Sequence, residues 1–66
     1  MQIQLNGEPR QFERSMSVIE LIAALDLPPE VVAVELNGCL VPRSAHTEQL
    51  VEDGDRVEVV TLVGGG

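Results

Sequence analysis

The chain has 66 residues and a formal net charge of −7 at pH 7, from 11 acidic side chains and four basic ones. This length allows one small domain and leaves little room for a catalytic cleft of ordinary size. A negative chain without Trp or Tyr repels phosphate backbones and offers bases almost nothing to stack on, so nucleic-acid binding is disfavoured and a partner with a basic surface is favoured.

Two strands joined by a tight turn are predicted at the start of the chain. Residues 1–5 alternate apolar and polar, which is the pattern of a half-buried strand with its odd-numbered side chains on one face. Asn6 and Gly7 offer the two positive φ angles of a hairpin turn. The returning strand, over residues 9–13, begins at a proline and is therefore expected at a sheet edge.

A short amphipathic helix follows. Ser17 is its predicted N-cap, and Glu20, three residues later, completes a capping box. Pro28 and Pro29 are expected to end the helix. Because β-branched residues stand at its start, packing on a sheet rather than helix propensity must stabilise it. Its apolar face consists of Val18, Leu21, Ile22 and Leu25.

Strands and turns alternate through the second half of the chain. The predicted elements are a strand over 31–36, a turn at Asn37-Gly38, a strand over 39–41 that ends at Pro42, a helical turn over 44–49 with Ser44 as its cap, a turn at Asp53-Gly54, and a strand over 56–63. The last strand is nearly continuously apolar, which favours a central position in the sheet.

Together these elements predict an α+β fold of the β-grasp, or ubiquitin-like, class. In it a mixed sheet of four to five strands packs on one helix, with the last strand between the first and the third. Residues 1–63 form the predicted domain, and residues 64–66 form a flexible glycine tail. Because the chain has only one helix to cover the sheet, the other face of the sheet is expected to be exposed.

The two-residue period of the last strand assigns this bare face. Arg56 and Glu58 belong in water, and they share their face with Val60 and Leu62. These four residues are the predicted partner-binding surface.

The third strand adds to the same face. Glu35 is expected to face water, and Val31 and Ala33 share its face because residues two positions apart in a strand point to the same side. The sequence therefore predicts an apolar patch rimmed by acidic residues. Coverage of this patch by self-association is an alternative to partner binding.

Sets of residues for catalysis or metal binding are absent from the sequence. One His and one Cys give neither a triad nor a metal-ligand spacing. His46 is expected at the surface, and Cys39 is expected to be unreactive because nothing basic adjoins it. Arg43 could stabilise the loop after the preceding proline or contact a partner.

With a single cysteine and neither a signal segment nor a long apolar run, we expect a cytoplasmic protein away from membranes.

The three terminal glycines are the feature with a chemical meaning. Gly64 and Gly65 have no Cβ, so the tail can pass through a narrow channel. Three extended residues span roughly 10 Å, enough to carry the carboxylate of Gly66 into the active site of another protein. This carboxylate is ionised at neutral pH and can attack the α-phosphorus of ATP in an adenylating enzyme. The acyl adenylate is then open to attack by a sulfur or amine nucleophile.

Several segments together match the pattern of one family. They are the opening Met-Gln-Ile, the helix, the Asn37-Gly38 turn, Val41-Pro42-Arg43, the run from Asp53 to Val60, and the terminal glycines. From end to end and without insertions, the chain resembles the ThiS family of sulfur carriers in thiamine biosynthesis. The third glycine, at position 64, departs mildly from the family's usual ending.

The resemblance implies a series of reactions. A ThiF-like adenylyltransferase uses ATP and Mg²⁺ to adenylate Gly66, and a persulfide from a cysteine desulfurase or another source replaces the adenylate. The thiocarboxylate then gives its sulfur to a ThiG-like thiazole synthase. The carrier is thus a co-substrate rather than an enzyme and binds no cofactor or metal of its own. Two alternatives share the glycine ending, the small subunit of molybdopterin synthase and a ubiquitin-like modifier or interaction module.

Overall fold

The computed structural model describes residues 1–62, and its main feature is a five-stranded mixed sheet built around the last strand. Strand β7 (Arg56–Thr61) lies between β1 (Gln2–Leu5), which runs parallel to it, and β4 (Val32–Leu36), which runs antiparallel. Strands β2 (Glu8–Gln11) and β5 (Cys39–Val41) form the two edges. The predicted β-grasp class and the central place of the last strand are therefore confirmed.

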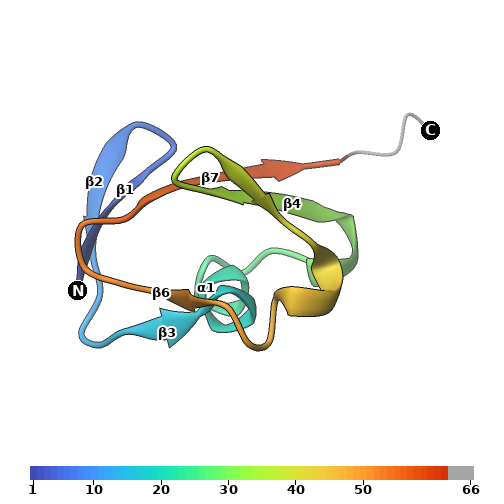
Figure 1. The fold of residues 1–66 in the computed structure, drawn as a ribbon, viewed down its shortest axis with the longest axis horizontal. Helices are drawn as coiled ribbons and strands as arrows, with labels where there is room; N and C mark the ends of the chain where they lie inside the picture. The colour runs from blue at the N-terminus through green and yellow to red at the C-terminus, as the bar shows by residue number, and fades with distance from the viewer. Residues whose placement is uncertain (63–66) are drawn as a thin grey trace.

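A second layer packs against this sheet. In Figure 1 the five-stranded sheet is the upper layer, and helix α1 (Val18–Ala24) lies below it beside a two-stranded sheet. The small sheet pairs β3 (Met16–Ser17) with β6 (Leu50–Val51), and it is not among the elements predicted from the sequence. Two 3-10 turns, η1 (Pro29–Val31) and η2 (Arg43–Ala45), complete the described elements.

The core fills the space between the two layers. Alternate residues of β1, β4 and β7 point into it, as the period of two predicts, and they meet the apolar face of α1. The buried side chains are Ile3, Leu5, Val18, Leu21, Ile22, Val32, Val34, Val41, Val51, Val57 and Val59.

The helix begins as predicted but ends earlier. The Ser17 backbone N–H donates to Glu20 Oε1 at 2.8 Å, and the Glu20 N–H donates to Ser17 Oγ at 3.3 Å, which is a complete capping box. The helix ends at Ala24 and not at the prolines, because Asp26 adopts a left-handed φ of 60°. The Asp26 and Leu27 N–H groups then bond back to the helix, as in a Schellman motif.

Several boundaries and one environment differ from the sequence-based expectation. The second strand is Glu8–Gln11 rather than 9–13, and the last strand ends at Thr61 and does not include Leu62. Val31 belongs to η1 rather than to a strand. The turn near residue 44 begins after Pro42, so Ser44 is not its cap. His46 is buried rather than on the surface, because it lies between the end of β5 and the first turn of α1.

The burial of His46 has a clear structural role. Only 3% of this residue is exposed, and its Nε2 lies 3.2 Å from the carbonyl oxygen of Val41. Its own carbonyl oxygen accepts the N–H of Ile19 at 2.9 Å. His46 therefore joins the end of β5 to the first turn of α1.

In the part of the chain that the structure describes, no helix is long and apolar enough to cross a membrane.

Candidate functional site: the outer sheet face

The outward face of β7 has the composition that the period of two predicts. Val57 and Val59 are buried under the sheet, whereas Arg56, Glu58 and Val60 are exposed. Leu62, just after the strand, is also exposed, and its N–H donates to the carbonyl oxygen of Val31. The predicted exposure of Arg56 and of the three residues that share its face is confirmed, while their role in binding a partner stays a prediction.

Two neighbouring strands extend this face. Ala33 lies opposite Val60 in the β4–β7 pairing, and Leu40 lies opposite Glu35 in the β4–β5 pairing. At 66% exposure, Leu40 is more exposed than Val60 at 54% or Leu62 at 53%. We call Ala33, Leu40, Val60 and Leu62 the outer patch.

Leu40 is not among the residues predicted in the patch, although the sequence contains a signal for its exposure. Asn37 and Gly38 have φ angles of 53° and 86°, which form a two-residue hairpin turn. Such a turn fixes the register, so the second residue after it must face Glu35 and therefore point outward. Val31, by contrast, was predicted in the patch but is half-buried in η1.

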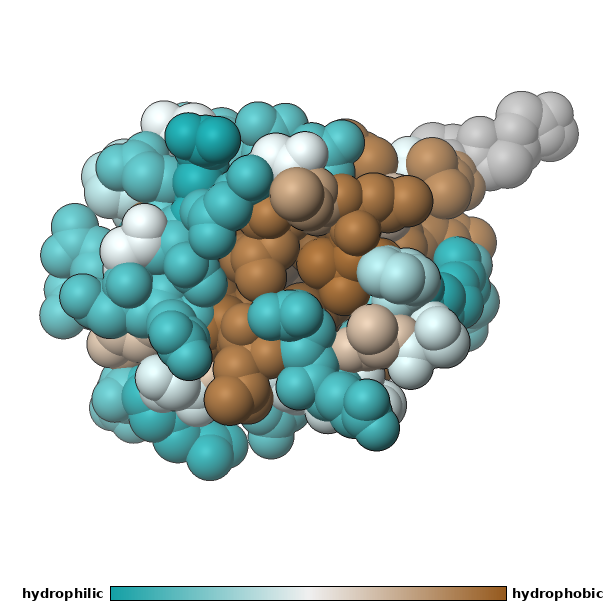
Figure 2. Space-filling view, viewed as in Figure 1, coloured by the Kyte–Doolittle hydropathy of each residue, from teal (hydrophilic) through white to brown (hydrophobic). Residues whose placement is uncertain are grey.

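A groove of about 110 Å³ adjoins the outer patch at the edge of the sheet. Three residues of the patch, Ala33, Leu40 and Leu62, line it together with Val32, Val41, Pro42, Arg43 and His46. Figure 2 shows hydrophobic residues gathered across the middle of the molecule and toward the carboxyl end of β7, whereas hydrophilic residues cover the end that holds β1 and β2. On this face the apolar surface thus extends from the middle of the molecule to the carboxyl end of β7 (Figure 2).

Charged groups frame the outer patch. Glu35 on β4 and Glu58 on β7 lie opposite each other, and Arg56 lies two residues before Glu58 on the same face of β7.

The Arg43 guanidinium donates from Nη1 to the carbonyl oxygen of Glu30 at 2.7 Å. Of the two roles considered for Arg43, the structure shows the stabilising one, which joins η1 to η2.

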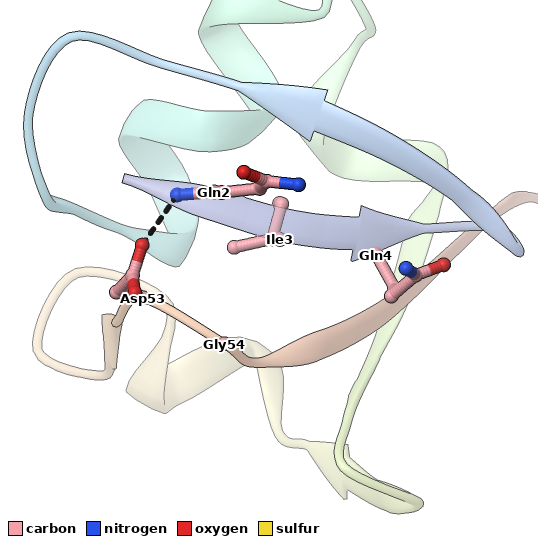
Figure 3. Close-up of a pocket in the computed structure, with 5 residues that line it drawn as sticks. All are labelled: Gln2, Ile3, Gln4, Asp53 and Gly54. Atoms are coloured by element: carbon pink, nitrogen blue, oxygen red, sulfur yellow. Dashed lines mark hydrogen bonds between the residues drawn. The ribbon is translucent and has the colours of Figure 1, made fainter.

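A different pocket lies at the other end of β7 and is shown in Figure 3. Gln2, Ile3 and Gln4 line it from β1, and Asp53 and Gly54 line it from the turn before β7. Asp53 Oδ1 accepts the Gln2 N–H at 2.7 Å, and the Gly54 N–H donates to the Gln2 carbonyl oxygen at 2.8 Å. These polar groups tie the start of β1 to the turn, so the pocket has a structural explanation.

The remaining reactive side chains do not assemble into a reaction centre. Among residues 1–62, no three His, Cys, Asp or Glu side chains come close enough to hold a metal ion. Cys39 is exposed at the start of β5, and His46 is buried on a backbone carbonyl. The predicted reacting atoms at Gly66, and Gly64 and Gly65 with them, lie outside the described residues.

Comparison with known proteins identifies the family. The model of the ThiS family matches residues 3–66. The chain belongs to the ThiS family. It is therefore a small sulfur carrier of thiamine biosynthesis and not an enzyme.

Individual relatives agree with this family. The sulfur carrier protein ThiS of Escherichia coli (strain K12) is 32% identical over 66 residues, which cover all of both chains. The crystal structure of the thiamine biosynthesis protein ThiS from Geobacter metallireducens covers all of both chains with a TM-score of 0.87 and 40% identity.

A longer relative contains a ThiS-like segment. The thiazole synthase of Paramagnetospirillum magneticum is 42% identical over all 66 residues of this chain. The chain spans only 20% of the length of that protein. A ThiS-like sequence thus occurs within a polypeptide named as a thiazole synthase.

Proposed function

We propose that this ThiS-family chain carries sulfur as a thiocarboxylate on Gly66 and gives it up for thiazole formation. Residues 1–63 serve as the docking domain, and residues 64–66 serve as the tail that enters a partner's active site. The observation that carries the proposal is the outer patch, which ends at Leu62, four residues before the terminal carboxylate. Four extended residues span about 14 Å, so a partner docked on the patch can also reach Gly66.

The first step forms an acyl adenylate. A carboxylate oxygen of Gly66 attacks the α-phosphorus of ATP, the bond from that phosphorus to the β-phosphate bridge oxygen breaks, and pyrophosphate leaves. The ThiF-like adenylyltransferase supplies the ATP and Mg²⁺ site. The carrier contributes the carboxylate and the docking surface, because its described side chains provide no metal site of their own.

The second step transfers sulfur. The terminal sulfur of a persulfide, supplied directly or indirectly by a cysteine desulfurase, attacks the Gly66 carbonyl carbon and AMP leaves. A thiol then attacks the resulting acyl disulfide, so that the S–S bond breaks, a new disulfide forms and the Gly66 thiocarboxylate is released. The thiocarboxylate is a better nucleophile than the carboxylate, and it passes its sulfur to a ThiG-like thiazole synthase.

The thiazole synthase is the proposed acceptor because of the longer relative described above. A segment similar to this entire chain is part of a protein named as a thiazole synthase. Joining two proteins in one polypeptide raises the local concentration of each for the other, which is useful only if they interact. Since ATP is the proposed co-substrate, we place these reactions in the cytoplasm.

The test compares carriers that differ only at the terminus. Removing one glycine still leaves a Gly-Gly ending, so this variant is the matched control and should be adenylated by a ThiF-type enzyme with MgATP. Removing all three glycines, or converting the Gly66 carboxylate to an amide, should abolish ATP–pyrophosphate exchange. Full exchange with the amide would contradict the proposal, since the reacting oxygen would then be missing.

A further inference from the structure

One strand of the central sheet extends well past its neighbour. Strand β1 pairs with β7 only at Gln4 with Arg56 and at Leu5 with Val57. On the other side, β4 accompanies β7 as far as Thr61. From Val59 onward, β7 therefore has no strand residue of β1 beside it.

The side chain of Asn6 occupies the place of the missing strand residue. Its Oδ1 accepts the Val59 N–H at 2.8 Å, and its Nδ2 donates to the Val59 carbonyl oxygen at 3.2 Å. A primary amide has the same donor and acceptor as a peptide group, so it continues the hydrogen-bond ladder by one step. Asn6 does this from a turn position with a φ of 51°.

A second asparagine holds the opposite end of the same strand. Asn37 Oδ1 accepts the Arg56 N–H at 2.8 Å, and its Nδ2 donates to Asp55 Oδ1 at 3.1 Å. Asn37 also starts an Asn-Gly turn and has a φ of 53°. The two residues are thus alike in type, turn and contact with β7, but only Asn6 acts near the end that leads to Gly66.

We propose that Asn6 is a positioning residue that sets the direction in which β7 delivers the carboxyl-terminal segment to the adenylating partner. This inference rests on the proposed function, because it concerns the same terminal carboxylate. Without the two Asn6 bonds, β7 beyond Val57 is held on one side only. The chain at Leu62 then samples more directions, and fewer docked carriers present Gly66 in line with ATP. Misplacement of a reacting group by about 1 Å can slow a reaction up to a hundredfold.

The test uses Asn6→Gly with Asn37→Gly as its matched control. Glycine accepts the positive φ of both turns and removes only the side-chain hydrogen bonds. Both variants should unfold at a similarly lowered urea concentration. Steady-state adenylation by a ThiF-type enzyme should show kcat lowered about tenfold by Asn6→Gly with KM within about twofold, since the outer patch is intact, and little change for Asn37→Gly.

Amide hydrogen exchange measures the positioning without the enzyme. The Leu62 N–H, which bonds to Val31, should exchange faster in Asn6→Gly than in Asn37→Gly. Equal kcat values for the two variants would overturn the inference. If the unsubstituted chain is not adenylated, the proposed function fails, and the exchange comparison then decides the positioning role alone. Faster Leu62 exchange in Asn6→Gly supports the role, and equal exchange refutes it.

Discussion

Glu35 and Glu58 lie directly opposite each other on the exposed face of the central sheet. Two like charges at facing positions of adjacent strands destabilise a sheet. Both flank the outer patch. In the free chain the two charges repel each other, whereas in a complex with a basic partner both would be attracted to the partner's surface. We therefore expect the pair to belong to a binding surface, although it is unfavourable in the isolated chain.

Glu58→Gln tests this explanation. The variant should be more stable to urea by roughly 0.2–1 kcal/mol, because one of two facing charges is removed. It should also associate more slowly with the adenylating partner, and the difference should shrink as salt is added. Glu8→Gln, on the edge strand β2, makes the same charge change away from the patch. If Glu8→Gln slows association as much as Glu58→Gln, net charge and not the pair determines the rate.

Leu40→Ser tests the outer patch. We expect Leu40, the most exposed residue of the outer patch, to be an anchor of the interface. A loss of about 1.4 kcal/mol of binding free energy on truncation would raise the Kd for the adenylating partner about tenfold. Stability should change little, since 66% of Leu40 is exposed. Leu50→Ser is the matched control, because Leu50 is 53% exposed on the separate sheet β3–β6. Calorimetric titration of both variants gives the answer, and equal weakening by the two would remove Leu40 from the interface.

Asp26 is expected to limit the stability of the fold. It has a φ of 60° and places a negative charge at the carboxyl end of α1, and both are unfavourable. Asp26→Gly should raise the free energy of unfolding by roughly 0.5–1 kcal/mol, as measured by urea denaturation. Asp26→Asn separates the causes, since it removes the charge and keeps a side chain at the same φ. A lower stability for Asp26→Gly would mean that the Asp26 side chain is favourable after all.

Glu20 contributes to the stability of the fold in a way that depends on pH, and the direction of its pKa shift gives the sign of that dependence. The backbone hydrogen bond from Ser17 lowers the pKa of Glu20 from its usual value of 4.5. Because the folded-state pKa lies below the unfolded one, the stabilisation is fully present above about pH 4.5 and is lost as the pH falls through the folded value. The stability difference between the unsubstituted chain and Glu20→Ala should therefore be larger at pH 7 than at pH 2.5. A difference that grows on acidification has the wrong sign for this capping box.

Much of the fold could be predicted because its information is local. The alternation in β1 and β7, the Asn-Gly turns and the capping box at Ser17 each depend on residues close in sequence. The exposed position of Leu40 was also accessible, since the turn at Asn37 fixes its register.

Other features depend on contacts between distant parts of the chain. The pairing of Met16 with Val51 involves two strands of two residues each, too short to have a period. Burial of His46 depends on β5 folding over α1. The amide of Asn6 meets Val59 across 53 positions, and nothing near Asn6 in the sequence distinguishes it from an ordinary turn residue.

Sulfur is expected on the terminal carboxylate and on no side chain. Cys39, which is exposed, is the alternative position for a sulfur atom. The most direct measurement is the intact and fragment mass of the protein purified from its own cell, together with a Cys39→Ser variant. We expect a species with one oxygen replaced by sulfur at Gly66, present equally in the Cys39→Ser variant. Added sulfur found only on Cys39, and lost in that variant, would contradict it.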